Sequence, residues 1–285
     1  MYSQMPLVSV YITTCNRLDK LKRAVRSVQE QTFENIEILI CDDASTDGTE
    51  KYVQELIRED NRIRYFRNQT SKGACAARNL GIFNAKGQYI TGLDDDDEFL
   101  PLRISKFLEV WDSKYSFICC DFIERFAEGK TKKYYNSKNI TKFTYVNMLF
   151  ENVASNQIFT LTERLKTIDG FDVRARRLQD WDTWLRLSYR FGDFIRLPIA
   201  TYIMHHDHAM DEKRVSKSYP LSSSLIDLRD RNMEIYTDKH LEFMNFIIST
   251  EEKKARPLDS FIWSVRKKTP KYIIKYALQS FLYNK

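Results

Sequence analysis

The sequence predicts an α/β protein with a mostly parallel central sheet, helices on both faces of that sheet and a helical C-terminal extension. Two observations support the sheet. Short apolar, β-branched segments alternate with amphipathic helical segments over the first hundred residues. Each apolar segment ends in a polar cluster, as strands do when their carboxyl ends bind ligands at one edge of a sheet. A third observation, a basic stretch with helical spacing at the end of the chain, predicts the extension.

The predicted elements alternate in type from the N-terminus. Runs rich in Val and Ile predict strands at residues 7–14, 36–43, 63–68 and 88–93. Apolar residues at helical spacing predict helices at residues 18–31, 47–60 and 73–85. Asp47 or Thr49 is a suitable cap for the second helix. Further along, residues 181–191 predict a helix and residues 195–204 a strand.

Length and composition indicate a globular protein. The chain has 285 residues and 43% apolar content, enough for one large domain, or one domain and an appendage, with a substantial core. Its five cysteines are odd in number and show no C-x-x-C spacing, which fits neither a disulfide framework nor a zinc site. With no signal-like start and no run of ~18 apolar residues, the expected compartment is the cytoplasm.

The formal net charge of +6 is concentrated at the end of the chain. Residues 251–285 contain nine Lys or Arg and three Asp or Glu, and the rest of the chain is balanced. A balanced body without a basic, aromatic-rich motif does not favour a nucleic-acid-binding protein.

Five consecutive acidic side chains, Asp94 to Glu98, follow the strand at residues 88–93. Like charges at this spacing repel one another, so the pattern predicts a cation that the chain itself does not supply. Carboxylates bind hard divalent cations, and such a cation stabilises the charge of a leaving diphosphate.

Four stretches, in this order, resemble an inverting family 2 glycosyltransferase of the GT-A fold, of the bacterial polysaccharide or O-antigen type: VSVYITTCNR, QTFENIEILICDDASTDGT, KGACAARNLGIFNAKGQYITGLDDDDEFLP and GFDVRARRLQDWDTWLRL. The similarity covers roughly residues 6–210. It implies a GT-A domain at residues 1–212, with a nucleotide-binding half at 1–101 and an acceptor-binding half at 102–212. Residues 213–285 would form the basic helical extension.

The resemblance implies a metal site on the acidic cluster. Asp94 and Asp96 match the two aspartates of the family's DxD motif, with Asp95 between them in the nucleotide-binding set. Asp96 would bind Mn²⁺ or Mg²⁺ directly, and Asp94 would contact the ribose, or the metal through water. His205, in a Tyr-x-x-His pattern that starts at Tyr202, matches a family His near the diphosphate and is the second candidate metal ligand.

The resemblance also implies a nucleotide pocket. Asp43 matches the position that bonds the base, and a carboxylate accepts from the imide N–H of uracil or thymine, which favours a UDP- or dTDP-sugar donor. Thr13 and Asn16 would line the same pocket. Lys72 and Arg78 would add positive charge, although either could be a surface residue.

Asp180 matches the family's catalytic base. Gln179 stands where the family often has Glu, so Asp180 lacks a like-charged neighbour and is expected to be less basic. Asp182 is a competing candidate for the base, and a helix cap is the alternative role for Asp180.

The C-terminal segment at residues 269–285 predicts an amphipathic helix that starts near Thr269 and Pro270. Lys271, Lys275 and Gln279 form a polar stripe, and the other positions are largely apolar. With Arg266, Lys267 and Lys268 before it, this pattern is typical of a helix on an anionic membrane surface. The alternative is a packing helix with solvated lysines.

The functional expectation is a hexosyltransferase that moves one sugar from a nucleotide donor to a lipid-linked glycan in O-antigen or lipopolysaccharide synthesis. It would work peripherally on the inner face of the cytoplasmic membrane. The alternative is a catalytically inactive sugar-nucleotide-binding module of the same fold.

Overall fold

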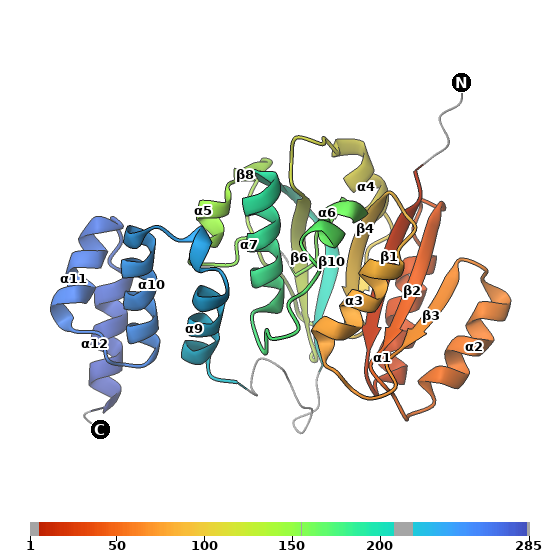
Figure 1. Ribbon diagram of the computed structural model, residues 1–285, viewed down its shortest axis with the longest axis horizontal. Helices are drawn as coiled ribbons and strands as arrows, with labels where there is room; N and C mark the ends of the chain where they lie inside the picture. Colours follow the sequence, from red (N-terminus) through yellow and green to blue (C-terminus); the bar gives the residue numbers. More distant parts are fainter. Residues whose placement is uncertain (1–5, 155, 208–218, 284–285) are drawn as a thin grey trace. The chain divides into compact units, whose positions relative to one another are not determined.

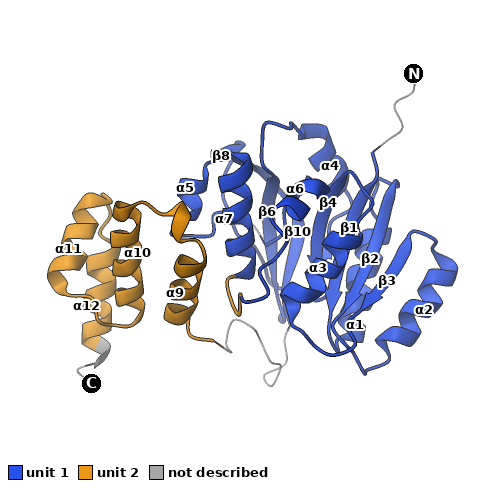
Figure 2. Ribbon diagram, viewed as in Figure 1, with its two compact units in different colours: residues 1–174, 179–212 blue, residues 175–178, 213–285 orange. Residues whose placement is uncertain are grey.

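The structure is a computed structural model that describes residues 6–154, 156–207 and 219–283. The chain divides into two compact units (Figure 2). The first is formed by residues 1–174 and 179–212, and the second by residues 175–178 and 213–285.

Within the described residues of the first unit, ten strands form one sheet (Figure 1). Their order is β3-β2-β1-β4-β9-β6-β10-β5, with β7 paired to β6 and β8 paired to β10. The strands are β1 (Val8–Thr14), β2 (Ile36–Asp42), β3 (Ile63–Arg67), β4 (Tyr89–Asp94), β5 (Glu98–Phe99), β6 (Ile118–Phe126), β7 (Thr131–Lys133), β8 (Thr141–Phe143), β9 (Phe159–Leu161) and β10 (Phe194–His206).

The sheet is parallel where the sequence shows strict alternation of strands and helices. β3, β2, β1 and β4 are parallel neighbours, and β6 pairs in parallel with β10. β9 runs antiparallel to both β4 and β6 and joins the two parallel parts. The predicted fold class is confirmed, while the antiparallel strands of the second half carry no comparable periodic signal.

Helices cover both faces of the sheet, as predicted (Figure 1). They are α1 (Leu18–Gln29), α2 (Thr49–Glu59), α3 (Ala74–Asn84), α4 (Arg103–Val110), α5 (Tyr145–Met148), α6 (Thr162–Thr167) and α7 (Gln179–Phe191). α1 and α4 pack on one face, and α3 with its neighbour α6 lies on the other. All seven residues of β1 are buried, since the strand is covered on both sides.

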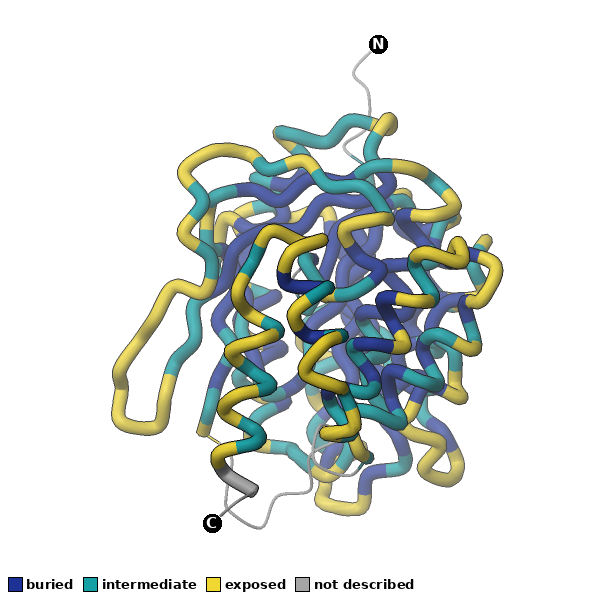
Figure 3. The backbone as a smooth tube through the Cα atoms, turned by 90° about the vertical axis from the view of Figure 1, so that its left-hand side faces the viewer, coloured by how far each residue is buried: buried dark blue, intermediate teal, exposed yellow. Residues whose placement is uncertain are grey.

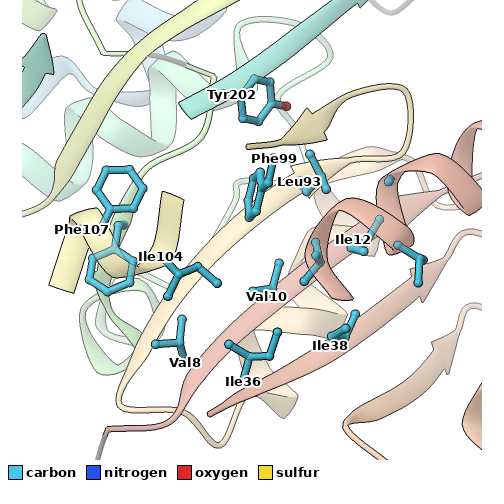
Figure 4. Packing of buried hydrophobic residues seen from close by; sticks show 14 of the residues in the cluster. Val8, Val10, Ile12, Ile36, Ile38, Leu93, Phe99, Ile104, Phe107 and Tyr202 are labelled. Atoms are coloured by element: carbon cyan, nitrogen blue, oxygen red, sulfur yellow. The ribbon is translucent and has the colours of Figure 1, made fainter. Parts of the chain in front are cut away.

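Alternate residues of β1 enter the two layers of the core. Val8, Val10 and Ile12 pack toward α1 and α4 in a cluster of buried aliphatic and aromatic side chains (Figure 4). Tyr11 points to the opposite face, where a Cβ at Gly81 or Gly92 would lie within 2.4 Å of its atoms. Glycine is required at both positions because the side chain of Tyr11 fills the space that another side chain would need.

The sheet register brings the predicted site residues to one edge. Thr13 on β1 lies opposite Cys41 on β2 and Asp94 on β4. The carboxyl ends of three parallel strands therefore meet where their polar clusters begin, which is where open α/β sheets bind ligands.

The second unit is helical. Its elements are α9 (Leu221–Arg231), a 3₁₀ turn (Met233–Ile235), α10 (Asp238–Glu251), α11 (Pro257–Arg266) and α12 (Lys271–Tyr283). Phe243 and Phe246 of α10 pack against Trp263 of α11 and Tyr272 of α12, with ring centroids 4.6 to 6.0 Å apart. In the described part of the chain, no helix has both the length and the apolar character needed to cross a membrane.

Candidate active site

Residues 94–98, here called the acidic turn, connect the end of β4 to β5. The amide of Asp97 donates to the carbonyl of Asp94 at 3.1 Å and closes a tight turn. Burial alternates along the turn: Asp95 and Asp97 are buried, while Asp94, Asp96 and Glu98 are half-buried. The half-buried carboxylates keep the access to solvent that a ligand-binding group needs.

The chain itself supplies part of the positive charge at the acidic turn, which the sequence led us to expect entirely from outside. Arg78 donates to Asp94 at 2.9 Å. Arg17 bridges the next two carboxylates, with Nη2 at 2.7 Å from Asp95 and Nη1 at 2.9 Å from Asp96. These two guanidinium groups face three carboxylates, so the chain compensates the charge of the acidic turn only in part, and metal binding has to be argued from the ligands.

The last two acids of the turn bind to β10. Asp97 accepts from the hydroxyl of Tyr202 at 2.6 Å and from the amide of His205 at 2.9 Å. Glu98 Oε1 lies 2.6 Å from Nε2 of His205. These contacts hold the turn against the neighbouring strand.

Burial and charge separate the protonation states of these acids. Burial favours the neutral form of Asp94, but the charge and hydrogen bond of Arg78, together with Arg17 and Gln157, lower the pKa of Asp94 overall. Burial raises the pKa of Asp95 to about 7, although Arg17 opposes the shift. The pKa of Asp97 is also raised, because it is buried and faces Asp96.

Arg78, on α3, joins the two halves of the site. Its Nη1 donates to Gln179 at 2.7 Å, and its Nη2 donates to Asp94 and lies 3.9 Å from Oδ1 of Asp180. The guanidinium also lies over the ring of Phe171, 5.0 Å from the centroid. Burial disfavours the charge on Arg78, but the two carboxylates raise its pKa overall. This buried cation therefore stays charged and holds the ends of β4 and α7 together.

Asp180, the predicted base, lies in the first turn of α7. Its side chain is 27% exposed, and its buried Oδ1 accepts no hydrogen bond from the part of the chain that the structure describes. Burial raises the pKa of Asp180 to about 6, against the opposing charge of Arg78 and with a smaller contribution from Asp94. Burial therefore offsets the less basic character expected from Gln179. A carboxylate with this pKa and a partly exposed side chain is suited to receive a proton.

Asp182, the competing candidate, has a structural role. Its side chain is buried and bonds Arg186 at 2.9 Å. The same guanidinium donates to the carbonyls of Ile168 and Gly170. Asp182 thus secures the segment before α7, and the geometry favours Asp180 as the base.

Asp43, predicted to bond the donor base, anchors the loop before α3. It accepts from the side chains of Asn68 and Ser71 at 2.8 and 2.7 Å, and from the amides of Lys72 and Gly73, each at 2.8 Å. Burial would raise the pKa of Asp43, but these bonds lower it overall. They use the roughly four acceptor positions of a carboxylate, so a base reaches Asp43 only when a donor leaves.

Of the other residues predicted for the nucleotide pocket, Thr13 contacts the acidic turn, whereas Asn16 bonds to the loop after β2 and Lys72 is exposed. The hydroxyl of Thr13 donates to Asp94 at 3.4 Å, which places Thr13 in the site. Asn16 accepts from the amide of Thr46 at 2.7 Å and so orders the loop after β2. Lys72 is exposed.

His205 is buried between two carboxylates. Nε2 faces Glu98, and Nδ1 lies 3.8 Å from Asp207. Burial lowers the pKa of His205, with a further contribution from Arg23. The neighbouring His208 lies outside the described residues.

Metal ligands are not assembled in advance: among the residues that the structure describes, no three His, Cys, Asp or Glu side chains form a metal-binding group. Mg²⁺ commonly binds through one or two carboxylates together with substrate phosphates and water. The half-buried oxygens of Asp94 and Asp96 match that partial set. The residues therefore fit a divalent cation that arrives with a diphosphate.

Sequence reasoning missed three residues that shape the site. Arg17 follows Asn16 in the first motif and could have been found by searching for cations at the carboxyl ends of the strands. Arg23 donates to the carbonyl of Asp96 at 2.6 Å from the second turn of α1. Gln157 lies 3.4 Å from Asp94 and comes from a segment without a readable pattern.

Comparisons with known proteins agree with this architecture. Residues 9–210 match the sequence profile of glycosyl transferase family 2. WcaA of Escherichia coli strain K12, a glycosyl transferase assigned to colanic acid biosynthesis, is 37% identical over 211 residues, which cover 71% of this chain and 74% of WcaA.

Two further proteins are similar to this chain, one in sequence and one in structure. The GalNAc(5)-diNAcBac-PP-undecaprenol beta-1,3-glucosyltransferase of Campylobacter jejuni is 38% identical over 48% of this chain and 45% of its own length. The structure of S. aureus TarS residues 1–349 in complex with UDP-GlcNAc aligns with a TM-score of 0.67 and 17% identity, over 94% of this chain and 79% of that one. At this identity the likeness establishes the fold, the predicted GT-A arrangement.

Proposed function

Because the chain belongs to glycosyl transferase family 2, we propose that it is a metal-dependent inverting enzyme. It moves one sugar from a nucleoside-diphosphate sugar to a hydroxyl of a lipid-linked glycan in surface polysaccharide synthesis. The arrangement of Asp94 and Asp180 on either side of Arg78 carries this proposal. It combines a carboxylate at the expected diphosphate site with a second, partly exposed carboxylate that has a raised pKa.

In the proposed reaction Asp180 accepts the proton of the acceptor hydroxyl as that oxygen attacks the anomeric carbon. A carboxylate within hydrogen-bond reach suits this task. Arg78 keeps the side chain of Asp180 near the donor pocket, since its other bonds go to Asp94 and Gln179. The attack comes from the face opposite the leaving nucleotide, so the anomeric configuration inverts.

The leaving diphosphate gains negative charge as the glycosidic bond breaks. Asp96, with Asp94 beside it, would hold a divalent cation, which would supply the positive charge that stabilises the leaving group. Mn²⁺ and Mg²⁺ both prefer oxygen ligands. His205 is the less suitable ligand in this conformation, because its Nε2 faces Glu98.

UDP-sugars are the first donors to consider. Uracil offers an imide N–H to a carboxylate such as Asp43, and the structural relative TarS was solved with UDP-GlcNAc. Binding through Asp43 requires a donor such as Ser71 to leave the carboxylate. The loop before α3 should therefore move when the nucleotide binds.

The decisive experiment is a panel of sugar nucleotides, with release of the nucleoside diphosphate as the readout. We expect release with at least one UDP-sugar, faster in the presence of an undecaprenyl-diphosphate-linked acceptor, the acceptor class named for the Campylobacter relative. Tight binding of a nucleotide sugar without release on any acceptor would favour the alternative of an inactive binding module.

The proposal also places the enzyme at the inner face of the cytoplasmic membrane through its basic C-terminal unit. Lys275 of α12 binds Glu251, and Gln279 donates to the carbonyl of Thr250, so part of the polar stripe faces α10. α12 therefore packs on α10, as the alternative of a packing helix expects, but Lys275 is paired and not solvated. In Figure 3 the helix that ends at the C-terminus shows exposed and intermediate residues along its described length, and none is buried.

The exposed apolar side chains of α11 and α12 form a stripe on each helix. Their spacing of three and four residues keeps each stripe on one face. The residues are 51 to 67% exposed and comprise Leu258, Phe261, Val265, Ile274, Leu278 and Phe281. Arg266, Lys267 and Lys268 are exposed at the turn between the helices. Each contributes roughly 1 kcal/mol near an anionic surface, whereas they would repel a second copy of the same face.

We expect the double substitution Phe261→Ser and Leu278→Ser to lower binding to anionic vesicles at least ~10-fold, because each buried apolar side chain contributes roughly 1.5–3 kcal/mol. Co-sedimentation with vesicles is the measurement, and high salt should release the parent chain partly. Val173→Ser, at a 64% exposed position of the first unit, is the control and should bind like the parent. Equal binding by the double variant, or no binding by the parent, contradicts the membrane role.

A further inference from the structure

Arg17 lies where the proposed metal would have to bind. Its guanidinium spans two neighbouring carboxylates, with Nη2 on Asp95 and Nη1 on Oδ2 of Asp96. Asp95 is fully buried, whereas Asp96 is 17% exposed at its side chain. One side of this bridge is therefore fixed in the protein interior, and the other reaches the accessible edge of the site.

A divalent cation and Arg17 compete for the same carboxylate. Direct coordination of Mg²⁺ by Asp96 places the cation about 2.0–2.1 Å from a carboxylate oxygen. Arg17 Nη1 is already 2.9 Å from Oδ2 of that carboxylate. Two positive groups in contact with one carboxylate repel each other, so the bond from Nη1 to Asp96 has to break for the cation to bind.

A diphosphate removes this conflict. Its negative charge offsets both cations, and its oxygens accept charge-assisted hydrogen bonds from a guanidinium. The side chain of Arg17 is 34% exposed, so one face of it is open to a ligand. Nη2 can keep its ion pair with the buried Asp95 while Nη1 turns from Asp96 to a phosphate oxygen.

We propose that Arg17 is an exchangeable counter-ion that makes divalent-cation binding at Asp96 depend on the nucleoside diphosphate. In the absence of nucleotide, Arg17 neutralises Asp96 and keeps the cation out. When the diphosphate binds, Arg17 moves one hydrogen bond to it and releases Asp96 to the cation. This inference rests on the proposed function, because it assumes that Asp96 is the metal ligand.

The test measures Mn²⁺ binding to the full chain by electron paramagnetic resonance, with and without UDP and without any acceptor. For the parent chain, UDP should tighten Mn²⁺ binding at least ~10-fold, within the usual range of coupling between sites. Arg17→Met should bind Mn²⁺ at least ~10-fold more tightly than the parent without UDP, and UDP should then add little. Arg26→Met, at an exposed position of α1 where the arginine pairs with Glu30, is the matched control and should behave like the parent.

Arg17→Lys keeps the test informative if Arg17→Met does not fold, as judged by circular dichroism. A lysine offers one point charge and cannot bridge two carboxylates, so its Mn²⁺ affinity without UDP should fall between the other two. The inference is overturned if both Arg17 variants bind Mn²⁺ like the parent while UDP still tightens binding; the metal proposal survives that result. If no chain binds Mn²⁺ even with UDP, both the inference and the metal proposal fail.

Discussion

Asp180→Asn is expected to lower turnover at least ~10²-fold while donor affinity stays nearly unchanged. The substitution removes the group that accepts the acceptor's proton, and general base catalysis typically contributes at least this factor. Arg78 retains its bonds to Asp94 and Gln179, so the donor side of the site should persist. Steady-state rates together with nucleotide binding by calorimetry separate the two effects.

The pH dependence provides a second check on the same residue. The base acts in its ionised form, and burial raises the pKa of Asp180 to about 6. The rate at low substrate should therefore fall as pH decreases through about 6 and level off above it. The Asp180→Asn variant should lose this limb of the profile.

The contribution of Asp180 to folding stability should change with pH in the opposite direction to the rate. The folded pKa of Asp180 is raised, so the folded state binds its proton more tightly than the unfolded state, and this stabilising contribution is lost as pH rises toward about 6. A shift of this size corresponds to about 3 kcal/mol against the ionised form. Asp180→Asn should thus melt at or above the temperature of the parent at pH 7.

Asp182→Asn is the matched comparison. It weakens the buried bond to Arg186 and should lower the melting temperature. If Asp182→Asn instead kept its stability and lost turnover while Asp180→Asn stayed active, the base would be Asp182.

Asp96→Ala is expected to lower transfer at least ~10²-fold and to weaken donor binding. A cation that neutralises the leaving diphosphate is worth several kcal/mol in the transition state, and Asp96 is proposed to hold it. A chelator should have the same effect on the parent chain, and Mn²⁺ or Mg²⁺ should restore activity. Initial rates with a defined donor are the measurement.

A loss of activity in Asp96→Ala could also arise from unfolding, but the structure argues against that explanation. Asp96 is half-buried, and its partner Arg17 keeps the bond to Asp95. The variant should therefore retain the circular dichroism spectrum of the parent. Full activity of the parent chain in excess chelator would rule out metal dependence.

Much of the first unit could be predicted because its signals are local. The strands at β1, β2, β3 and β4 are short β-branched runs, and the helices between them show a clear apolar period. Parallel strands place their carboxyl ends together, so the neighbourhood of Thr13 and Asp94 followed from the strand order. The short antiparallel strands β7, β8 and β9 span three residues each, too few for a period to be visible.

The sequence by itself determined the fold class, the edge of the sheet that carries the site and the acids that gather there, because these depend on periodicity and on residue type. Only the tertiary structure decided which partner each acid has. Arg17 neutralises Asp95 and Asp96, and the loop before α3 occupies Asp43. It also decided that part of the polar stripe of α12 faces α10. Hydrogen bonds and ion pairs join side chains that are far apart in the chain, and their burial sets pKa values, so no local pattern encodes them.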